Sequence, residues 1–209
     1  MKTVYIIDSN YPADHYAERA DGIVAQHILK ALGIQTDLRL ALDREHFRKA
    51  VRRALRQGCD VLHISTHGDD DSIAVCNDHP GSGLPEGFHW DEFVSLFQGR
   101  YDAPTALVMS ACNGASTRLA QAFAAARNRP KIIIGSSDER YPADYVAAWA
   151  LLYRRFKRKG IKRGVAQRAL ADISAAVHKN FRYLRWDDGR KRYLRYPGTG
   201  ARFDIIERR

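Results

Sequence analysis

A histidine and a cysteine stand out because each follows a short apolar run and is followed by a glycine-containing turn. One run begins at Asp60 and ends in His67 and Gly68, and the other begins at Ala106 and ends in Cys112. A thiol is a weak nucleophile until it ionises, and a neighbouring imidazolium together with a helix N-terminus lowers its pKa. The histidine can then pass a proton to the leaving group as a general acid. The two segments therefore predict a nucleophile at Cys112 with His67 as its acid and base.

The residues that flank this pair suit the negative charge that such a reaction develops. Gly68 has no side chain to block a substrate carbonyl, so its backbone N–H and that of Cys112 are predicted to form an oxyanion hole. Asn113 and Gly114 allow a sharp turn from strand to helix. This chemistry requires no cofactor and no metal ion, and we predict neither.

The apolar pattern predicts the sheet that must position both groups. Five short runs rich in Val, Ile and Leu are predicted as strands, namely 4–8, 36–42, 60–65, 106–110 and 131–135. Stripes of apolar residues at helical spacing separate these runs, and this alternation is typical of a parallel sheet with helices on both faces. Functional groups collect at the carboxyl ends of such strands. If the third and fourth strands are neighbours, about 4.8 Å apart, the side chains just past their ends can meet.

The last third of the chain follows a different pattern. From Asp144 two successive helices are predicted, then a hairpin over 181–196 and a final strand over 203–206. No internal repeat or linker interrupts the chain. We therefore predict one domain over 1–209, with a helical and hairpin subregion from about 151 to 209.

Positive charge is concentrated in this subregion. Residues 1–150 hold 16 Lys and Arg against 19 Asp and Glu, whereas 151–168 hold eight basic residues and no acidic one. The favoured interpretation is a solvated helix face whose long side chains cover apolar surface. The alternative is a surface for nucleic acid, which the interleaved aromatic residues of 181–196 would support.

The two motifs together resemble the caspase-like cysteine peptidases. A strand ending in His67-Gly68 is followed 45 residues later by a strand ending in Ser-Ala-Cys112, where caspases have Gln-Ala-Cys. The resemblance is strongest to the CHAT branch, which commonly has a second histidine where His63 stands and an apolar-x-Ser-Ala run before the cysteine. It extends over roughly residues 1–160, including a connecting hairpin and a helix around 90–97.

The resemblance implies a three-layer caspase-like α/β fold with a mostly parallel central sheet. It also implies a cysteine endopeptidase that acts on protein or peptide substrates through an acyl-enzyme, with His67 and Cys112 as its dyad. Two other functions stay open: a non-cleaving adaptor scaffold that serves a regulatory protein partner, and a basic module associated with nucleic acid.

The same resemblance leads to a prediction about the substrate. In caspases, arginines from the loops after the first and fifth strands line the pocket for the residue before the cleaved bond, helped by the residue two before the cysteine. The matching positions here are Asp8, Asp138 with Glu139, and Ser110. Acidic residues replace basic ones, which favours cleavage after Arg or Lys through a charge-assisted hydrogen bond. The alternative is that Asp8 and Asp138 only cap the turns after their strands.

Several other conspicuous residues are predicted to be structural. Cys59 and Cys76 form neither a disulfide framework nor a zinc-ribbon spacing with Cys112. His63 faces the same way as His67 but lies too far along the strand to share its proton transfer. The aspartates at 69–71, even with Asp78, lack the ligand spacing of a calcium loop and are predicted as a solvated turn. The loop over 80–87 either borders the substrate cleft or connects two elements.

The location of the protein is predicted from two features that the sequence lacks. No run of about 18 or more apolar residues is present, and the N-terminus shows no apolar segment followed by a cleavage site. We therefore predict a cytoplasmic protein that does not enter a membrane.

Overall fold

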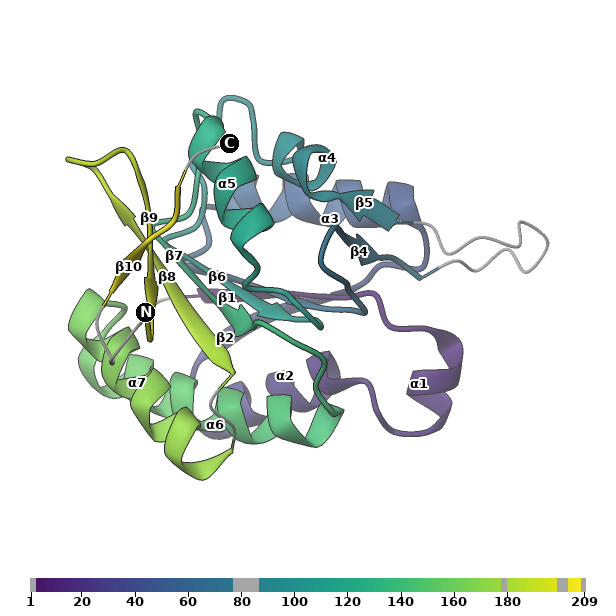
Figure 1. Cartoon of the computed structure of the whole chain (residues 1–209). Coiled ribbons are helices and arrows are strands. Elements are labelled where there is room, and N and C mark those ends of the chain that lie inside the picture. Colours follow the sequence, from purple (N-terminus) through teal and green to yellow (C-terminus); the bar gives the residue numbers. More distant parts are fainter. Residues whose placement is uncertain (1–2, 77–86, 178–179, 199–202, 208–209) are drawn as a thin grey trace.

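The computed structural model describes residues 3–76, 87–177, 180–198 and 203–207, and an eight-stranded sheet forms its centre (Figure 1). Its strands lie in the order β10-β9-β8-β7-β6-β3-β1-β2. In chain order they are β1 (Thr3–Asp8), β2 (Gln35–Leu40), β3 (Val61–Ser65), β6 (Ala106–Ser110), β7 (Ile132–Ser136), β8 (Phe181–Asp187), β9 (Arg192–Tyr196) and β10 (Asp204–Ile205). A separate ribbon pairs β4 (Ser72–Ala74) with β5 (Gly87–His89).

The strands β1, β2, β3, β6 and β7 are parallel, and β8, β9 and β10 extend the sheet in antiparallel fashion. The parallel strands coincide with the five predicted runs, apart from a shift of one or two residues at some ends. The predicted hairpin forms β8 and β9, and the predicted last strand is the short β10. The mostly parallel sheet is thus confirmed, and β3 lies directly beside β6.

Helices cover both faces of the sheet (Figure 1). One face carries α3 (Arg44–Gln57), α4 (Trp90–Ser95) and α5 (Thr117–Ala125), and the other carries α2 (Asp21–Ala31), α6 (Pro142–Lys159) and α7 (Arg163–Ala176). The short α1 (Pro12–Tyr16) stands apart at one end of the sheet (Figure 1). None of the helices within the described ranges is both long and apolar enough to cross a bilayer.

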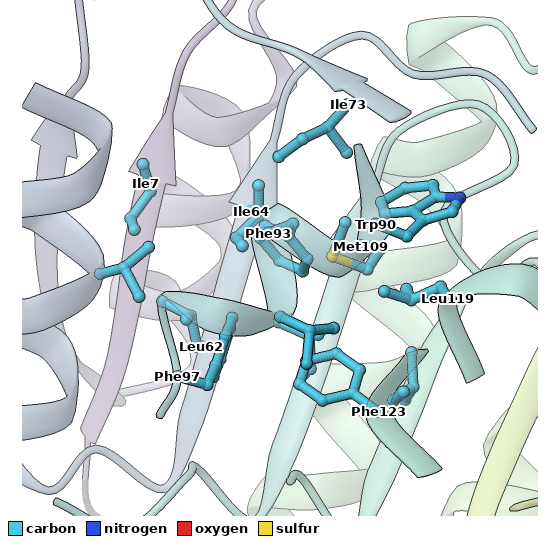
Figure 2. Packing of buried hydrophobic residues seen from close by; sticks show 14 of the residues in the cluster. Ile7, Leu62, Ile64, Ile73, Trp90, Phe93, Phe97, Met109, Leu119 and Phe123 are labelled. Carbon is cyan, nitrogen blue, oxygen red and sulfur yellow. The ribbon is translucent and has the colours of Figure 1, made fainter. Parts of the chain in front are cut away.

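Alternation of side chains along the central strands builds two cores, one on each face. On the α3, α4 and α5 face, strand residues meet a cluster of phenylalanines. Figure 2 labels several residues of this core: Ile7, Leu62, Ile64, Ile73, Trp90, Phe93, Phe97, Met109, Leu119 and Phe123. The strand residues between them point to the opposite core, which Trp149, Tyr153 and Phe156 of α6 dominate. Because both faces are buried, the strands read as continuous apolar runs.

The basic end of α6 is partly engaged within the fold. Arg155 forms an ion pair with Asp172 of α7 at 2.5 Å, and the Lys157 ammonium donates to the Gly33 carbonyl at 2.7 Å. Arg154 and Arg158 are exposed. This arrangement agrees with the favoured interpretation of a solvated helix face that also ties α6 to its neighbours.

His63 is a buried member of β3. Its Nδ1 lies 2.7 Å from the Tyr153 hydroxyl, and its ring meets Trp149 edge-on with the centroids 5.7 Å apart. Burial lowers the pKa of His63 to about 3, so the ring is neutral at physiological pH. The residue has the structural role that the sequence predicts for it.

We expect His63→Ala to lower the free energy of unfolding by about 2–4 kcal/mol at pH 7, because it leaves a cavity and an unpaired Tyr153 hydroxyl. Below pH 6.5 His63 becomes protonated in the unfolded state, but in the folded state it stays neutral down to about pH 3. The native residue therefore lowers the free energy of unfolding as the pH falls. The deficit of the variant should therefore shrink between pH 7 and pH 4. Urea unfolding across this range, with exposed His27→Ala as control, measures it. A deficit that grows toward acid would contradict the neutral buried ring.

Candidate active site

The register between β3 and β6 sets His67 beside Cys112. Ser65 at the end of β3 pairs with Ser110 at the end of β6, and the Thr66 N–H donates to the Ser110 carbonyl at 3.0 Å. His67 and Cys112 each lie two residues beyond this pair. Both therefore leave the sheet at the same edge, on neighbouring loops that meet where Gly68 lies against the Cys112 carbonyl.

The turn after β6 depends on its asparagine and glycine. Asn113 has a φ of 56°, in the left-handed region that asparagine tolerates better than most residues. A Cβ on Gly114 would lie 2.6 Å from a side chain of β6, so this position accepts only glycine. The Ala115 N–H then donates to the Ser136 carbonyl of β7 at 2.8 Å. The predicted sharp turn is confirmed, and it holds Cys112 at the edge of the sheet.

Gly68 brings the histidine loop against the backbone of the nucleophile. A Cβ at position 68 would lie 2.7 Å from the Cys112 carbonyl oxygen, so any side chain there would push the two loops apart. Among the described residues, neither the Gly68 N–H nor the Cys112 N–H donates a hydrogen bond. Two N–H donors on adjoining loops are thus unpaired next to the thiol, as an oxyanion hole requires.

Two residues at the start of α1 hold His67 in place. Its Nε2 lies 2.7 Å from Asp14 Oδ2, and the ring of Tyr11 stacks on the imidazole with the centroids 4.8 Å apart. An ionised carboxylate only accepts, so Nε2 carries the proton and Nδ1 is the nitrogen open to exchange. The imidazole side chain is 47% exposed, which leaves a substrate access to it.

Sequence reasoning missed both partners of His67. Pro12 and Asp14 are typical of a helix start, and α1 does begin there. That local signal carries no information about a contact with a residue 53 positions away. Only the folded chain places α1 over the end of β3.

The three cysteines lie in different environments. Cys59 and Cys76 are buried, whereas Cys112 is partly exposed. Burial raises the pKa of Cys59 to about 12, which keeps this thiol protonated and inert. Tyr145 of α6 lies close to Cys112: burial first, and then the charge of a Cys112 thiolate, raise the pKa of its phenol. Cys112 is the thiol that a substrate can reach.

Two of the three predicted pocket residues lie inside the protein. Asp8 and Ser110 are each 1% exposed. Asp8 Oδ1 accepts from the Asn10 backbone N–H at 3.1 Å and from its side-chain amide at 3.0 Å, so Asp8 does cap the turn after β1. The Ser110 hydroxyl bonds to Asp21 and accepts from the Trp149 indole at 2.8 Å. In this state neither side chain lines an open pocket.

Asp21 is the residue that joins these groups, and no local pattern in the sequence singles it out. Its carboxylate is buried at the start of α2 and accepts from the hydroxyls of Ser65 and Ser110, the pair that ends β3 and β6. Burial raises the pKa of Asp21 to about 6; both hydroxyls oppose this shift, and the charge of Asp8 adds to it. Two carboxylates thus lie together beneath the nucleophile.

Asp138, the third predicted pocket residue, already forms an ion pair within the protein. The guanidinium of Arg140 binds both carboxylate oxygens, and the Asn180 side chain and the Ser136 hydroxyl also donate to them. Although partial burial opposes it, these donors lower the pKa of Asp138 to about 2. The carboxylate is charged but compensated, which agrees with the turn-capping alternative.

The aspartates after Gly68 form a turn. The Asp69 carboxylate accepts from the N–H groups of Asp71 and Ser72, each at 2.7 Å. Asp78 lies outside the described residues. Of the loop predicted over 80–87, only Gly87 is described, as the first residue of β5.

Comparison with known proteins identifies the fold. No protein-family profile matches the chain, and no curated protein does. The complex of pro- and mature domains of RgpB from Porphyromonas gingivalis matches 86% of this chain at 13% identity with a TM-score of 0.57. The Arg-specific cysteine proteinase gingipain R matches 85% at 15% identity and 0.53. A secreted C11 cysteine protease from Bacteroides thetaiotaomicron matches 91% at 9% identity and 0.56.

These likenesses confirm the predicted three-layer caspase-like α/β fold. The chain spans 44% and 43% of the two gingipain chains and 67% of the C11 protease. Membership of the CHAT branch stays a prediction.

We expect Asp21→Asn to stabilise the protein by about 1–3 kcal/mol at pH 8, because it removes a buried charge while its amide can still bond both serines. The folded pKa lies above the unfolded value, so the carboxylate costs stability above about pH 6 and this cost disappears as pH falls through 6 toward 3.8. The variant should lose its advantage by about pH 4. Urea unfolding at three pH values tests this, with exposed Asp102→Asn as control. Destabilisation that is largest at pH 8 and disappears by pH 4 would show instead that the charge supports the fold.

Proposed function

We propose that the protein is a cysteine endopeptidase in which Cys112 is the nucleophile and His67 the acid and base. The observation that carries this proposal is the close packing of Gly68 on the Cys112 carbonyl, with two unpaired backbone N–H groups beside a partly exposed thiol. A buried structural cysteine needs no such surroundings. The fold shared with gingipain R and with the C11 protease supports the same chemistry.

The reaction follows from the positions of these groups. Cys112 Sγ gives its proton to His67 Nδ1 and attacks the substrate carbonyl, and the N–H groups of Gly68 and Cys112 stabilise the oxyanion that forms. The peptide C–N bond breaks as His67 Nδ1 passes a proton to the departing amine, which leaves a thioester on Cys112. Water then attacks the thioester while Nδ1 accepts its proton, and the acid product leaves with the thiol restored.

Asp14 and Tyr11 act through His67 as positioning residues. The carboxylate fixes the proton on Nε2 and stabilises the imidazolium that appears during the reaction. The stacked Tyr11 ring limits rotation of the imidazole. Neither group needs to touch the substrate.

We further propose that substrates carry Arg or Lys before the cleaved bond. Asp8 and Asp21 are buried together beneath the end of β6, and Asp8 is approached only by His15, at 3.4 Å, among the described cationic side chains. Both carboxylates are buried in this state, so a substrate cation reaches them only if substrate binding opens the end of β6; it would then relieve their mutual repulsion. Of the predicted pocket residues, Asp138 is compensated by Arg140, so the receptor we propose keeps Asp8 and adds Asp21. The solved structure of gingipain R describes an Arg-specific proteinase.

We expect Cys112→Ala to abolish both labelling by a thiol-reactive peptide probe and cleavage of fluorogenic peptides. His67→Ala should lower turnover about 10²-fold or more, the scale of general acid–base catalysis. Asp14→Asn should lower kcat about tenfold with KM unchanged, because the substrate is still bound but the imidazole is less well held. Probe labelling and steady-state kinetics measure all three effects.

The control for labelling is Cys59→Ala, which removes a buried thiol and should leave labelling intact. Circular dichroism establishes that each variant is folded. Unchanged cleavage in folded Cys112→Ala would overturn the dyad. Absence of labelling and cleavage in the native protein would favour the adaptor scaffold instead.

Peptides that differ only in Arg, Lys, Asp or Leu before the cleaved bond test the specificity. We expect kcat/KM for Arg and Lys to exceed that for Leu by about tenfold or more, and Asp21→Asn to remove most of this preference. Asp138→Asn should leave the preference unchanged, because the native carboxylate is already paired. Preference for Asp, or equal rates for all four peptides, would refute the basic specificity without affecting the dyad.

A further inference from the structure

A groove separates the carboxyl-terminal half of α3 from the end of α4 and the segment after it. Its volume is about 660 Å³, and apolar side chains of Leu55, Leu96 and Phe97 contribute to its lining. The two helices lie on the same face of the sheet, where Phe47 of α3 packs against Phe93 of α4. The volume falls within the range of pockets that bind small molecules.

The groove lies away from the candidate active site. The end of α3 leads through Gly58 into the start of β3, and the segment after α4 leads into the start of β6. His67 and Cys112 follow the opposite ends of these two strands. Because each strand has five residues, roughly 16 Å of strand separates the two regions. The groove therefore serves a purpose other than binding at the nucleophile.

Five cations from one helix line this groove: Arg48, Lys49, Arg52, Arg53 and Arg56. Their spacing puts like charges one helical turn apart, as in Arg48 with Arg52 and Arg52 with Arg56. Like charges at this spacing destabilise a helix. The negative end of the helix dipole stabilises Arg56 in the last turn, but the effect does not reach residues further back.

Acidic neighbours compensate only part of this charge. Three of the cations have a carboxylate within 4 Å: Arg48 with Glu92 at 3.3 Å, Lys49 with Glu45 at 3.7 Å and Arg53 with Asp37 at 3.9 Å. Among the described residues, Arg52 and Arg56 form no ion pair or hydrogen bond through their side chains. The groove thus keeps an excess of positive charge around an apolar floor.

We propose that this groove binds a small molecule that carries a chain of phosphate groups. Guanidinium groups bind phosphate oxygens in a bidentate manner, and several arginines on successive turns match several linked phosphates. A single phosphate would engage only part of the row. The charges gather in one hollow of limited volume, which fits a compact ligand better than an extended strand of nucleic acid. The binding is independent of the peptidase reaction.

The test uses the full chain with inorganic tripolyphosphate as probe, followed by calorimetric titration and thermal unfolding. We expect about 1 mM tripolyphosphate to raise Tm by about 3 °C or more, while sodium chloride at equal ionic strength does not. Arg52→Gln with Arg56→Gln should weaken tripolyphosphate binding about tenfold or more. The same double variant should unfold at a slightly higher Tm than the native protein when no ligand is present, because the repulsion is relieved.

The matched control is Arg154→Gln with Arg158→Gln, which removes two exposed arginines one turn apart on α6, on the other face of the sheet. It should bind tripolyphosphate as the native protein does. ATP in place of tripolyphosphate distinguishes a nucleotide from a bare phosphate chain, and tighter binding of either one supports the site. Equal loss of binding in both double variants, or an equal effect of sodium chloride, would overturn it. So would single-stranded RNA that binds more tightly than tripolyphosphate and depends on Arg52 and Arg56.

Discussion

The parallel pairing of β3 with β6 is the constraint on which the candidate site depends. Ser65 lies opposite Ser110, so the residues two positions further along leave the sheet together. The close approach of the two loops then restricts the residue types that fit. Gly68 leaves room for the Cys112 carbonyl, and Gly114 leaves room for the side chains of β6. A shift of one residue in this register would turn every side chain of one strand to the opposite face.

The buried carboxylate of Asp21 lowers the stability of this arrangement when it is ionised. Its bonds to Ser65 and Ser110 tie the start of α2 to the ends of the two central strands. Burial beside Asp8 nevertheless raises its pKa to about 6, mainly through desolvation, so the ionised form weakens the fold at neutral pH. Proteins commonly retain a destabilising buried charge where their function needs a charged group shielded from water. The apolar cores on both sides of the sheet supply the stability that offsets it.

The strands β1, β3, β6 and β7 were readable from the sequence because each is a short, mostly apolar run buried on both faces. Their positions needed no knowledge of partners. The edge at which the hairpin of β8 and β9 would join was not readable, because an aromatic-rich hairpin fits any exposed edge. Packing decided it: Tyr183 and Phe181 lie in the core beneath α6, next to β7. The contact between α1 and His67 was hidden for a similar reason, since it joins segments 53 residues apart.

In the candidate site, too, some features follow from the sequence and others only from the tertiary structure. The sequence by itself determined that His67 and Cys112 closely follow the ends of two buried strands and that glycines come soon after them, because strand periodicity and turn chemistry are local properties. It could not decide whether a carboxylate such as Asp8 faces a substrate or the interior, because the identity of a residue does not specify where its side chain points in the fold. The tertiary structure decided that Asp8 and Ser110 are buried, that Arg140 compensates Asp138 and that Asp14 holds His67. Each of these outcomes depends on which distant groups surround the side chain, and only the folded chain specifies that.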